Sequence, residues 1–397
     1  MPPLERAYVP YGAYWSTPFC RWQGSLQAHN SLELAARVAR AALLSRKVAL
    51  DALDGLVLGL TVPQPHALYG APWVAGMMGA PALTGPTVAQ ACATSARMVS
   101  VGALEIETGQ RECLLLLACD RTSNGPHVYY PNHSAPGGTG EAENWVWDNF
   151  NRDPGASVAM IDTAENVARA EGISREQQDE MTLLRYRQYQ DALAEDRAFQ
   201  RRYMAPVVLG SGKKETVIEA DEGVFPTTAE GLARLRPVID GGSVTFGSQT
   251  HPADGNAGLV LCSADRAGAL ARDPRVAVRI VALGEARVEK AMMPKAVVPA
   301  ARMALARAGI QAADCGAVKT HNPFAVNDVY FCRELSLAPE RVNRFGSSLV
   351  WGHPQGPTGL RSIVELIEEL HQAGGGYGLF SGCAAGDSAM AVVVKVG

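Results

Sequence analysis

Two hydrophobic periods alternate along most of the chain, and their alternation predicts an α/β protein. Residues 54–62 (DGLVLGLTV) and residues 113–119 are continuous apolar runs of strand length. A helix is predicted from Asn30, which opens a capping box, to about Lys47, and a second helix follows Cys92. Helices that alternate with apolar strands indicate a layered α/β fold.

The pattern breaks in the middle of the chain. Residues 122–162 are rich in Gly, Pro, Asn and aromatic side chains and have no clean period. Two helices are predicted after this stretch, at 163–170 and from Ser174, where a second capping box begins, to about Tyr203. A long stretch without periodicity inside a compact domain is usually functional. We therefore interpret residues 121–245 as a subdomain inserted between two strands of the first α/β unit.

The C-terminal part of the sequence repeats the order of the N-terminal part. A helix, the strand CGAVKTH (315–321), a loop and helix over 347–370 and the strands after 376 repeat the order found around 35–120. In both parts a glycine-marked loop opens a helix that leads to an apolar strand. We expect two packed copies of one βαβ-type unit. Their boundaries are 1–120 with 246–268 for the N-terminal half, 121–245 for the insert and 269–397 for the C-terminal half.

Composition and charge exclude several classes of protein. A chain of 397 residues is too long for one small core, and a net charge of −4 without a basic run gives no reason to expect nucleic acid or an anionic membrane as a partner. The N-terminal sequence lacks the segments of a signal peptide. The 8 cysteines form no CxxC pair, which favours reduced thiols, a cytoplasmic location and no metal site.

Cys92, His321, His353 and Cys383 are the residues with possible chemistry, and all stand at strand ends near glycine. Each alone has an ordinary interpretation, since free cysteine is often buried and a histidine in a turn is commonly structural. Together they occupy the places where α/β folds build active sites. A helix N-terminus favours a thiolate, a neutral imidazole accepts a thiol proton, and a second thiol can exchange a proton with carbon.

At these residues the sequence resembles the thiolase family over nearly its whole length. The matching motifs occur in the family's order: ACATSA (91–96), TAENVA (163–168) with ISREQQD (173–179), SVTFGSQTHPADGNAG (243–258), GHPQGPTG (352–359) and CAAG (383–386). The resemblance implies the thiolase fold. In that fold two similar βαβαβαββ halves pack as a five-layered αβαβα sandwich with an inserted loop domain that binds coenzyme A.

The resemblance also implies a role for each candidate residue. Cys92 would carry the acyl group as a thioester after His353 takes its proton, and Cys383 would be the acid and base at the α-carbon. Backbone N–H groups of Cys92 and Ala385 would form one oxyanion hole. His353 and His321 would form the other, with the His321 imidazole donating directly.

Three departures from the family's usual motifs qualify this picture. HNPF (321–324) stands where the family usually has NEAF. The histidine at this position is similar to that of sterol-carrier-protein type thiolases. Ala385 replaces a glycine and narrows the pocket, and Ala159 stands where many members have histidine. These changes argue against a plain acetoacetyl-CoA enzyme.

Further contacts are expected from the inserted segment. Thr250 would contact CoA, and positive charge alone suggests Arg185, Arg187 or Lys213 for its phosphates. The aromatic stretch ENWVWDNF either attaches the insert to the body or lines a pocket for a bulky or aromatic acyl group. The candidate pocket residues are Trp145, Trp147, Phe150, Ala159 and Phe324.

The resemblance implies a degradative 3-oxoacyl-CoA thiolase, a homodimer or a dimer of dimers that uses CoA as substrate and no cofactor. A biosynthetic condensing acetyl-CoA acetyltransferase has the same residues and stays open. So does a thiolase-like subunit that binds CoA esters and acts only with a small zinc-ribbon/OB-fold partner.

Overall fold

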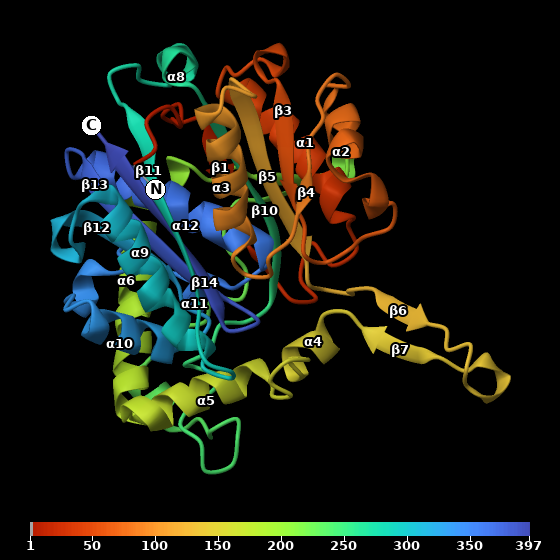
Figure 1. The fold of residues 1–397 in the computed structure, drawn as a ribbon, viewed down its shortest axis with the longest axis vertical. Coiled ribbons are helices and arrows are strands. Elements are labelled where there is room, and N and C mark those ends of the chain that lie inside the picture. Colours follow the sequence, from red (N-terminus) through yellow and green to blue (C-terminus); the bar gives the residue numbers. More distant parts are fainter. Residues whose placement is uncertain (1–2) are drawn as a thin grey trace.

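The computed structural model describes residues 3–397 and consists of two mixed β-sheets with helices between and outside them (Figure 1). The first sheet has the order β1-β10-β5-β3-β4, with β2 paired to β10. Strands β3 and β5 are almost entirely buried, which explains their continuous apolar sequence. The strands of this sheet are β1 (Tyr14–Ser16), β2 (Cys20–Arg21), β3 (Gly55–Gly59), β4 (Thr87–Val88), β5 (Cys113–Arg121) and β10 (Ala253–Cys262).

The second sheet repeats the strand directions of the first. Its order is β11-β14-β13-β12, with β12 parallel to β13 and β14 antiparallel to both of its neighbours. In the first sheet, β3 is likewise parallel to β5, and β10 is antiparallel to β5. The internal repeat predicted from the sequence is therefore visible in the topology. The strands are β11 (Val278–Arg287), β12 (Cys315–His321), β13 (Gly376–Ala384) and β14 (Ser388–Val396).

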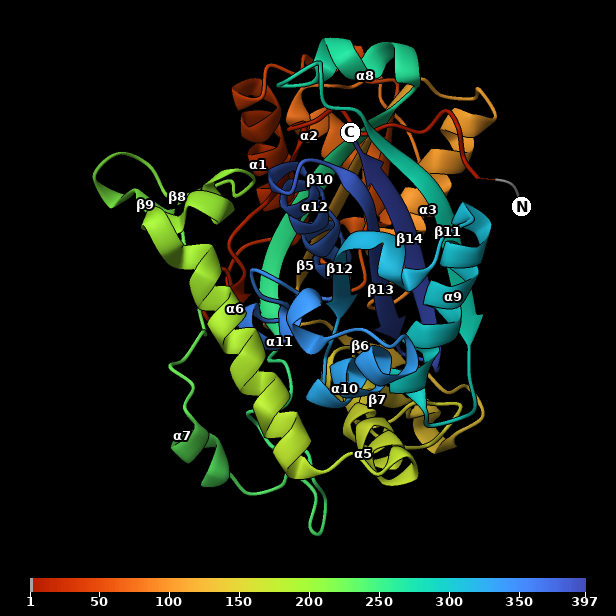
Figure 2. The ribbon, with the colours of Figure 1, turned by 90° about the vertical axis from the view of Figure 1, so that its left-hand side faces the viewer.

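Helices α3 (Thr94–Glu107) and α12 (Gly356–Gln372) lie between the sheets and contact strands of both. The outer layer on the first sheet is α1 and α2, and the outer layer on the second sheet is α9, against which α10 packs (Figure 2). This is the αβαβα layering expected. The bounds are α1 (Ser31–Ser45), α2 (Gly70–Met78), α8 (Ala264–Leu270), α9 (Val297–Ala308), α10 (Ala325–Glu334) and α11 (Ser348–Trp351). Within residues 3–397, no helix combines the length and apolarity that a bilayer crossing needs.

Helix α12 is buried on every side from its first residue to Leu370, so its charged residues require partners inside the protein. Glu368 accepts hydrogen bonds from the hydroxyl groups of Tyr11 (3.0 Å) and Tyr14 (2.8 Å) and pairs with Arg202 at 2.6 Å. These hydrogen bonds and this ion pair fix the position of α12, whose N-terminus lies at the site described below.

The inserted segment leaves the first sheet after β5 and returns at β10, and these two strands pair from Cys113↔Cys262 to Arg121↔Asp254. The helices predicted in it are present, and at Ser174 the capping box forms as expected. The β6–β7 hairpin extends away from the body (Figure 1). The elements are β6 (His127–Tyr130), β7 (Glu141–Asn144), α4 (Trp147–Asn151), α5 (Met160–Glu171), α6 (Arg175–Arg201), β8 (Val207–Leu209), β9 (Thr216–Ile218) and α7 (Ala229–Ala233).

Gly284 of β11 marks the place where α9 packs directly on the second sheet. A Cβ atom there would overlap with the carbonyl oxygen of Ala300 and lie 2.8 Å from the nitrogen of Ala304. Because these are backbone atoms, we expect Gly284→Ala to lower the free energy of unfolding by about 1–3 kcal/mol, measured by urea denaturation.

The control for this measurement is Gly268→Ala in α8, where a Cβ atom would meet nothing within 4 Å. This change should raise stability by about 0.5–1 kcal/mol, because alanine is the better helix former. A Gly284→Ala protein as stable as the parent would show that α9 does not pack as described.

Candidate active site

Cys92 lies in the tight turn between β4 and α3. The preceding residue, Ala91, has a φ of 42°, in the left-handed region that residues with a Cβ rarely occupy. The side chain of Thr94 closes the turn, because its hydroxyl accepts from Gln90 N–H (2.8 Å) and donates to the carbonyl oxygen of Ala91 (2.7 Å). As a result Cys92 is only partly buried, whereas all other cysteines are buried.

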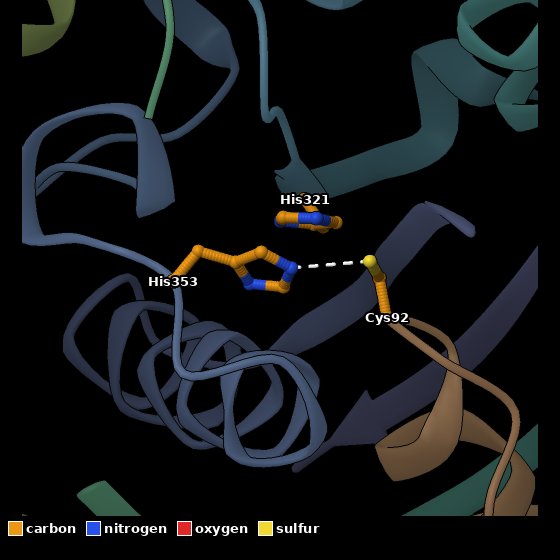
Figure 3. A group of neighbouring side chains, drawn as sticks. All are labelled: Cys92, His321 and His353. Atoms are coloured by element: carbon orange, nitrogen blue, oxygen red, sulfur yellow. Dashed lines mark hydrogen bonds between the residues drawn. The ribbon is translucent and has the colours of Figure 1, made fainter. Parts of the chain in front are cut away.

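His353 lies in the corresponding loop before α12, where Gln355 also has a positive φ of 64°. Its Nε2 atom is 3.1 Å from the sulfur of Cys92 (Figure 3). Its Nδ1 atom is 2.6 Å from the hydroxyl oxygen of Thr358. The two loops of the repeated units thus bring together residues 261 positions apart. Thr358 fixes the ring so that one nitrogen faces the thiol.

Burial keeps the Cys92–His353 pair neutral. Burial raises the pKa of Cys92 to about 12, against the smaller opposite effect of the backbone N–H groups of Ala385 and Cys92. Burial also lowers the pKa of His353 well below its usual value, and the adjacent His321 adds to this effect. The neutral imidazole is the form that accepts a proton from a thiol.

Cys383 stands at the end of β13 and is fully buried. The side-chain amide of Asn327 donates a hydrogen bond to its sulfur at 3.3 Å. Burial, and next the charge of a Cys92 thiolate, raise the pKa of Cys383 well above its usual value. Cys383 is therefore a protonated thiol at rest, with a hydrogen-bond donor ready for its thiolate.

His321 ends β12, and its ring packs on that of His353 with centroids 4.0 Å apart and planes inclined by 31° (Figure 3). Its Nδ1 atom is 2.8 Å from the hydroxyl oxygen of Ser348. Its Nε2 atom is buried and has no hydrogen-bond partner. Burial lowers the pKa of His321 to about 3, so the ring is neutral.

The hydrogen bonds around Ser348 hold the ring of His321 in place. Asn322 donates its amide to the carboxylate of Asp328 (2.7 Å), so its Oδ1 atom faces the hydroxyl of Ser348 at 3.0 Å. Ser348 Oγ also accepts from the backbone N–H of Asn322 (3.2 Å), and Asn322 Oδ1 also accepts from the N–H of Leu349 (3.2 Å), so both neutral tautomers of His321 fit these contacts. Donation from the unpartnered Nε2 atom to a substrate oxygen, which the resemblance implies, stays a prediction.

Arg185 is not available for a CoA phosphate, contrary to the expectation from charge. Its side chain is fully buried, with Nε 2.6 Å from Asp328 and Nη1 bonded to Gln188 (2.8 Å) and the carbonyl oxygen of Pro339 (3.0 Å). It anchors α6 of the insert to the residues behind His321. Arg187 and Lys213 are exposed, and their predicted role stays a prediction.

Thr250 and Phe324 lie beside the histidine loops. The hydroxyl of Thr250 donates to the carbonyl oxygen of Ser348 at 2.5 Å, and its N–H donates to the carbonyl oxygen of Pro323 at 2.7 Å. Phe324 is buried and is the last residue of the HNPF stretch that begins with His321. Contact of these two residues with CoA or an acyl group stays a prediction.

The remaining acyl-pocket candidates lie on the insert. The indole N–H of Trp145 donates to the carbonyl oxygen of Thr61 at 2.9 Å. This bond attaches the insert to the body, one of the two roles that the sequence left open for the aromatic stretch. Trp147 is 59% exposed on α4. Phe150 and Ala159 are partly buried, and Ala159 is the N-cap of α5.

Several residues that support the site were missed in the sequence: Thr358, Ser348, Asn327 and Asp120. Asp120 accepts hydrogen bonds from the backbone N–H groups of Thr61 (2.8 Å), Val62 (2.9 Å) and Gly356 (2.8 Å), and burial raises its pKa to about 7. The signal in the sequence that could have identified Asp120 is the position of its carboxylate at the end of an apolar strand. Thr358 lies inside the GHPQGPTG motif without being singled out by it, and Ser348 and Asn327 lie a few residues from the motifs, where spacing alone gives no hint.

Comparison with known proteins gives matches over almost the whole chain. The model of the thiolase N-terminal domain matches residues 13–265, and that of the thiolase C-terminal domain matches residues 274–396. An acetyl-CoA acetyltransferase of Escherichia coli is 31% identical over 390 residues, which cover 94% of this chain and 95% of that protein. The human mitochondrial 3-ketoacyl-CoA thiolase is 28% identical over 385 residues, with 96% of each chain covered.

Solved structures agree with these matches. The human mitochondrial 3-ketoacyl-CoA thiolase in complex with CoA has a TM-score of 0.90 at 27% identity and covers 100% of this chain and 99% of its own. The acetyl-CoA acetyltransferase of Bacillus anthracis has a TM-score of 0.91 at 27% identity over 100% of both chains. The α/β fold expected from the sequence is confirmed.

Replacing Thr358 by valine removes the hydroxyl that orients His353 and keeps the side-chain shape. We expect kcat/KM to fall about tenfold to a hundredfold, part of the about 10²–10⁴-fold that a positioned general base contributes. Steady-state kinetics with a 3-oxoacyl-CoA measure this, and Thr358→Ser, which keeps the hydroxyl, should retain most of the activity. Equal activity of the valine and serine variants would contradict the role of Thr358.

The pH profile of the enzyme should reflect the lowered pKa of His353. A histidine can act as a base only while it is neutral. It becomes protonated, and loses this ability, only when the pH falls below its pKa. We therefore expect kcat/KM to stay level as the pH falls through 6.5, the usual imidazole value, and to decline only at more acidic pH. A decline with its midpoint at the usual value would show that the imidazole is not desolvated as the structure indicates.

Proposed function

The chain belongs to the thiolase family, and on that premise we propose that it is a degradative thiolase that cleaves a 3-oxoacyl-CoA with CoA. The products are a shortened acyl-CoA and acetyl-CoA, or another acyl-CoA if the α-carbon is substituted. The observation that carries the proposal is the 3.1 Å contact between Cys92 and His353, with the thiol of Cys383 at the neighbouring strand end.

In the first half-reaction, the sulfur of Cys92 attacks the 3-oxo carbon while Nε2 of His353 takes its proton. The bond between the 3-oxo carbon and the α-carbon then breaks, and its electron pair becomes the enolate of the leaving acyl-CoA. Cys383 donates its proton to the α-carbon and becomes a thiolate, which the amide of Asn327 stabilises. The acyl group remains on Cys92 as a thioester.

In the second half-reaction, the thiol of CoA gives its proton to the Cys383 thiolate and attacks the thioester. Cys92 leaves as a thiolate and regains its proton from His353, so both thiols return to their starting state. The backbone N–H groups of Cys92 and Ala385, which lie at the sulfur of Cys92, would hold the oxyanion of both tetrahedral intermediates. Loss of one such donor typically costs about 10²–10³-fold in rate.

The direction and the acyl group are the finer parts of the proposal. The relatives include both acetyl-CoA acetyltransferases and 3-ketoacyl-CoA thiolases, so names alone do not distinguish synthesis from cleavage. The departures at His321, Ala159 and Ala385 argue against a plain acetoacetyl-CoA enzyme, and the aromatic stretch over residues 143–150 supports a bulkier acyl group. We propose a cytoplasmic homodimer or dimer of dimers with CoA as substrate.

Mass spectrometry of the acylated protein tests the proposal. The purified chain is exposed briefly to 3-oxoacyl-CoAs with short linear, branched and aryl acyl groups, without free CoA, so that the thioester accumulates. We expect the acyl mass on the peptide that contains Cys92, and its size names the preferred group. Cys92→Ser should give no thioester, while Cys20→Ser, a change in a buried thiol of β2, should be acylated like the parent.

Two results would contradict the proposal. An acyl mass that stays on a peptide without residue 92 in Cys92→Ser would exclude Cys92 as the nucleophile. If acetoacetyl-CoA is cleaved with a higher kcat/KM than every longer or aryl substrate, the proposed preference for a bulky acyl group is wrong. The condensing enzyme would then be favoured.

A further inference from the structure

Cys113 and Cys262 form a pair of thiols that the proposed reaction does not use. Cys113 is the first residue of β5 and Cys262 is the last residue of β10, and the antiparallel register places them directly opposite each other. Both are free and fully buried, and they lie in the same apolar cluster beside α1. The pairing of the two strands that carry the insert therefore holds these thiols as direct neighbours.

The backbone hydrogen bonds show which kind of cross-strand pair the two cysteines form. The N–H of Cys262 donates to the carbonyl oxygen of Tyr8 (2.7 Å), and the N–H of Tyr8 donates to that of Cys262 (2.8 Å). The carbonyl oxygen of Cys113 accepts from the N–H of Asp54 (2.8 Å), next to β3. Each cysteine thus bonds to the chain on its far side, which makes a non-hydrogen-bonded pair. The Cα atoms of such pairs are about 4.5 Å apart, within the range of about 4.4–6.8 Å that a disulfide needs.

The two thiols differ in acidity. The S–H of Cys262 donates a hydrogen bond to the sulfur of Cys113, which lowers the pKa of Cys113 and raises that of Cys262. Burial acts against the lowering at Cys113, and the guanidinium of Arg266, in the first turn of α8, adds to it. Since the thiolate is the form that attacks an oxidant, Cys113 is the sulfur that reacts first.

Helix α8 is the cover through which an oxidant reaches this pair. It begins two residues after Cys262 at the edge of the body, and none of its residues is buried (Figure 1). Its partly buried residues Ala267 and Leu270 pack against the cluster that contains both cysteines. An element with few buried contacts opens locally at a small fraction of the free energy of global unfolding. Hydrogen peroxide is small and uncharged, so a brief opening of α8 is enough to admit it.

We propose that Cys113 and Cys262 are an oxidation site at which a peroxide joins the two sulfurs in a disulfide. The sulfur of Cys113 attacks an oxygen of hydrogen peroxide, the O–O bond breaks, and Cys113 becomes a sulfenic acid while one water molecule leaves. The sulfur of Cys262 then attacks that of Cys113, and the hydroxyl group leaves with the thiol proton as a second water molecule. The two thiols lose two electrons and two protons in total, and a dithiol reductant restores them.

The disulfide would close a covalent loop around the entire insert. A cross-link of this kind stabilises mainly by restricting the unfolded chain, and it does so more for a longer loop. We expect the Tm of the oxidised protein to be about 2–6 °C above that of the reduced protein. Neither sulfur enters the proposed thiolysis, so the two proposals stand independently.

Oxidation of the purified full-length protein tests the site. The folded protein is treated with increasing hydrogen peroxide, the remaining thiols are alkylated, and the unreduced digest is analysed by mass spectrometry. We expect a linked pair of peptides that contain Cys113 and Cys262, and loss of this link after treatment with dithiothreitol. Cys119→Ser, a change in a buried thiol on the same face of β5, is the matched control and should form the link like the parent.

Single variants test the order in which the two sulfurs react. In Cys262→Ser, dimedone, which traps sulfenic acids, should label Cys113. In Cys113→Ser, the thiol of Cys262 should stay unlabelled, because burial also raises its pKa.

Three outcomes would overturn the proposal. The first is absence of the link at every peroxide concentration at which circular dichroism shows a folded protein. The second is equal dimedone labelling of Cys113 and Cys262 in the two single variants. The third is a Tm of the cross-linked protein that is no higher than that of the reduced protein. Acylation of Cys92, measured on the reduced protein, tests the thiolase reaction separately.

Discussion

The contact between the N-terminal turns of α3 and α12 is the constraint on which the catalytic arrangement depends. Ser95 donates a hydrogen bond to the carbonyl oxygen of Gly356, and a Cβ atom on Gly359 would lie 2.8 Å from the Cβ atom of Ser95. Asp120, at the end of β5, accepts from the N–H of Gly356. These contacts join the two repeated units at the loops that carry the thiol and the imidazole, so their relative position is a property of the core.

Burial then determines how these groups behave. A desolvated thiol beside a desolvated imidazole is more stable as a neutral pair than as an ion pair. In the proposed reaction the thiolate would form only as the proton moves during attack, and the new charge would pass to a substrate oxygen near the backbone N–H groups of Cys92 and Ala385. A thiol kept in this state is protected from unwanted reactions with other electrophiles, because the thiolate is the reactive form.

The sequence predicted the layers, the repeat and the main site residues because each has a local signal. Apolar runs of strand length predicted β3 and β5, and glycine-marked motifs drew attention to Cys92, His353 and Cys383. The role of Arg185 could not be predicted, because a charge on a helix looks the same whether solvent or Asp328 faces it. The position of the His321 ring depends on Ser348 and Asn322 together, which no spacing in the sequence reveals.

The buried pair of Arg185 and Asp328 has a consequence for the mobility of helix α6. Asp328 also accepts hydrogen bonds from Thr320 (2.6 Å) and Asn322 (2.7 Å), so α6 is connected to the strand end that carries His321. Breaking a buried pair of this kind costs about 3–5 kcal/mol, several times thermal energy. Helix α6 therefore cannot move away from the end of β12 as a lid unless this buried pair breaks.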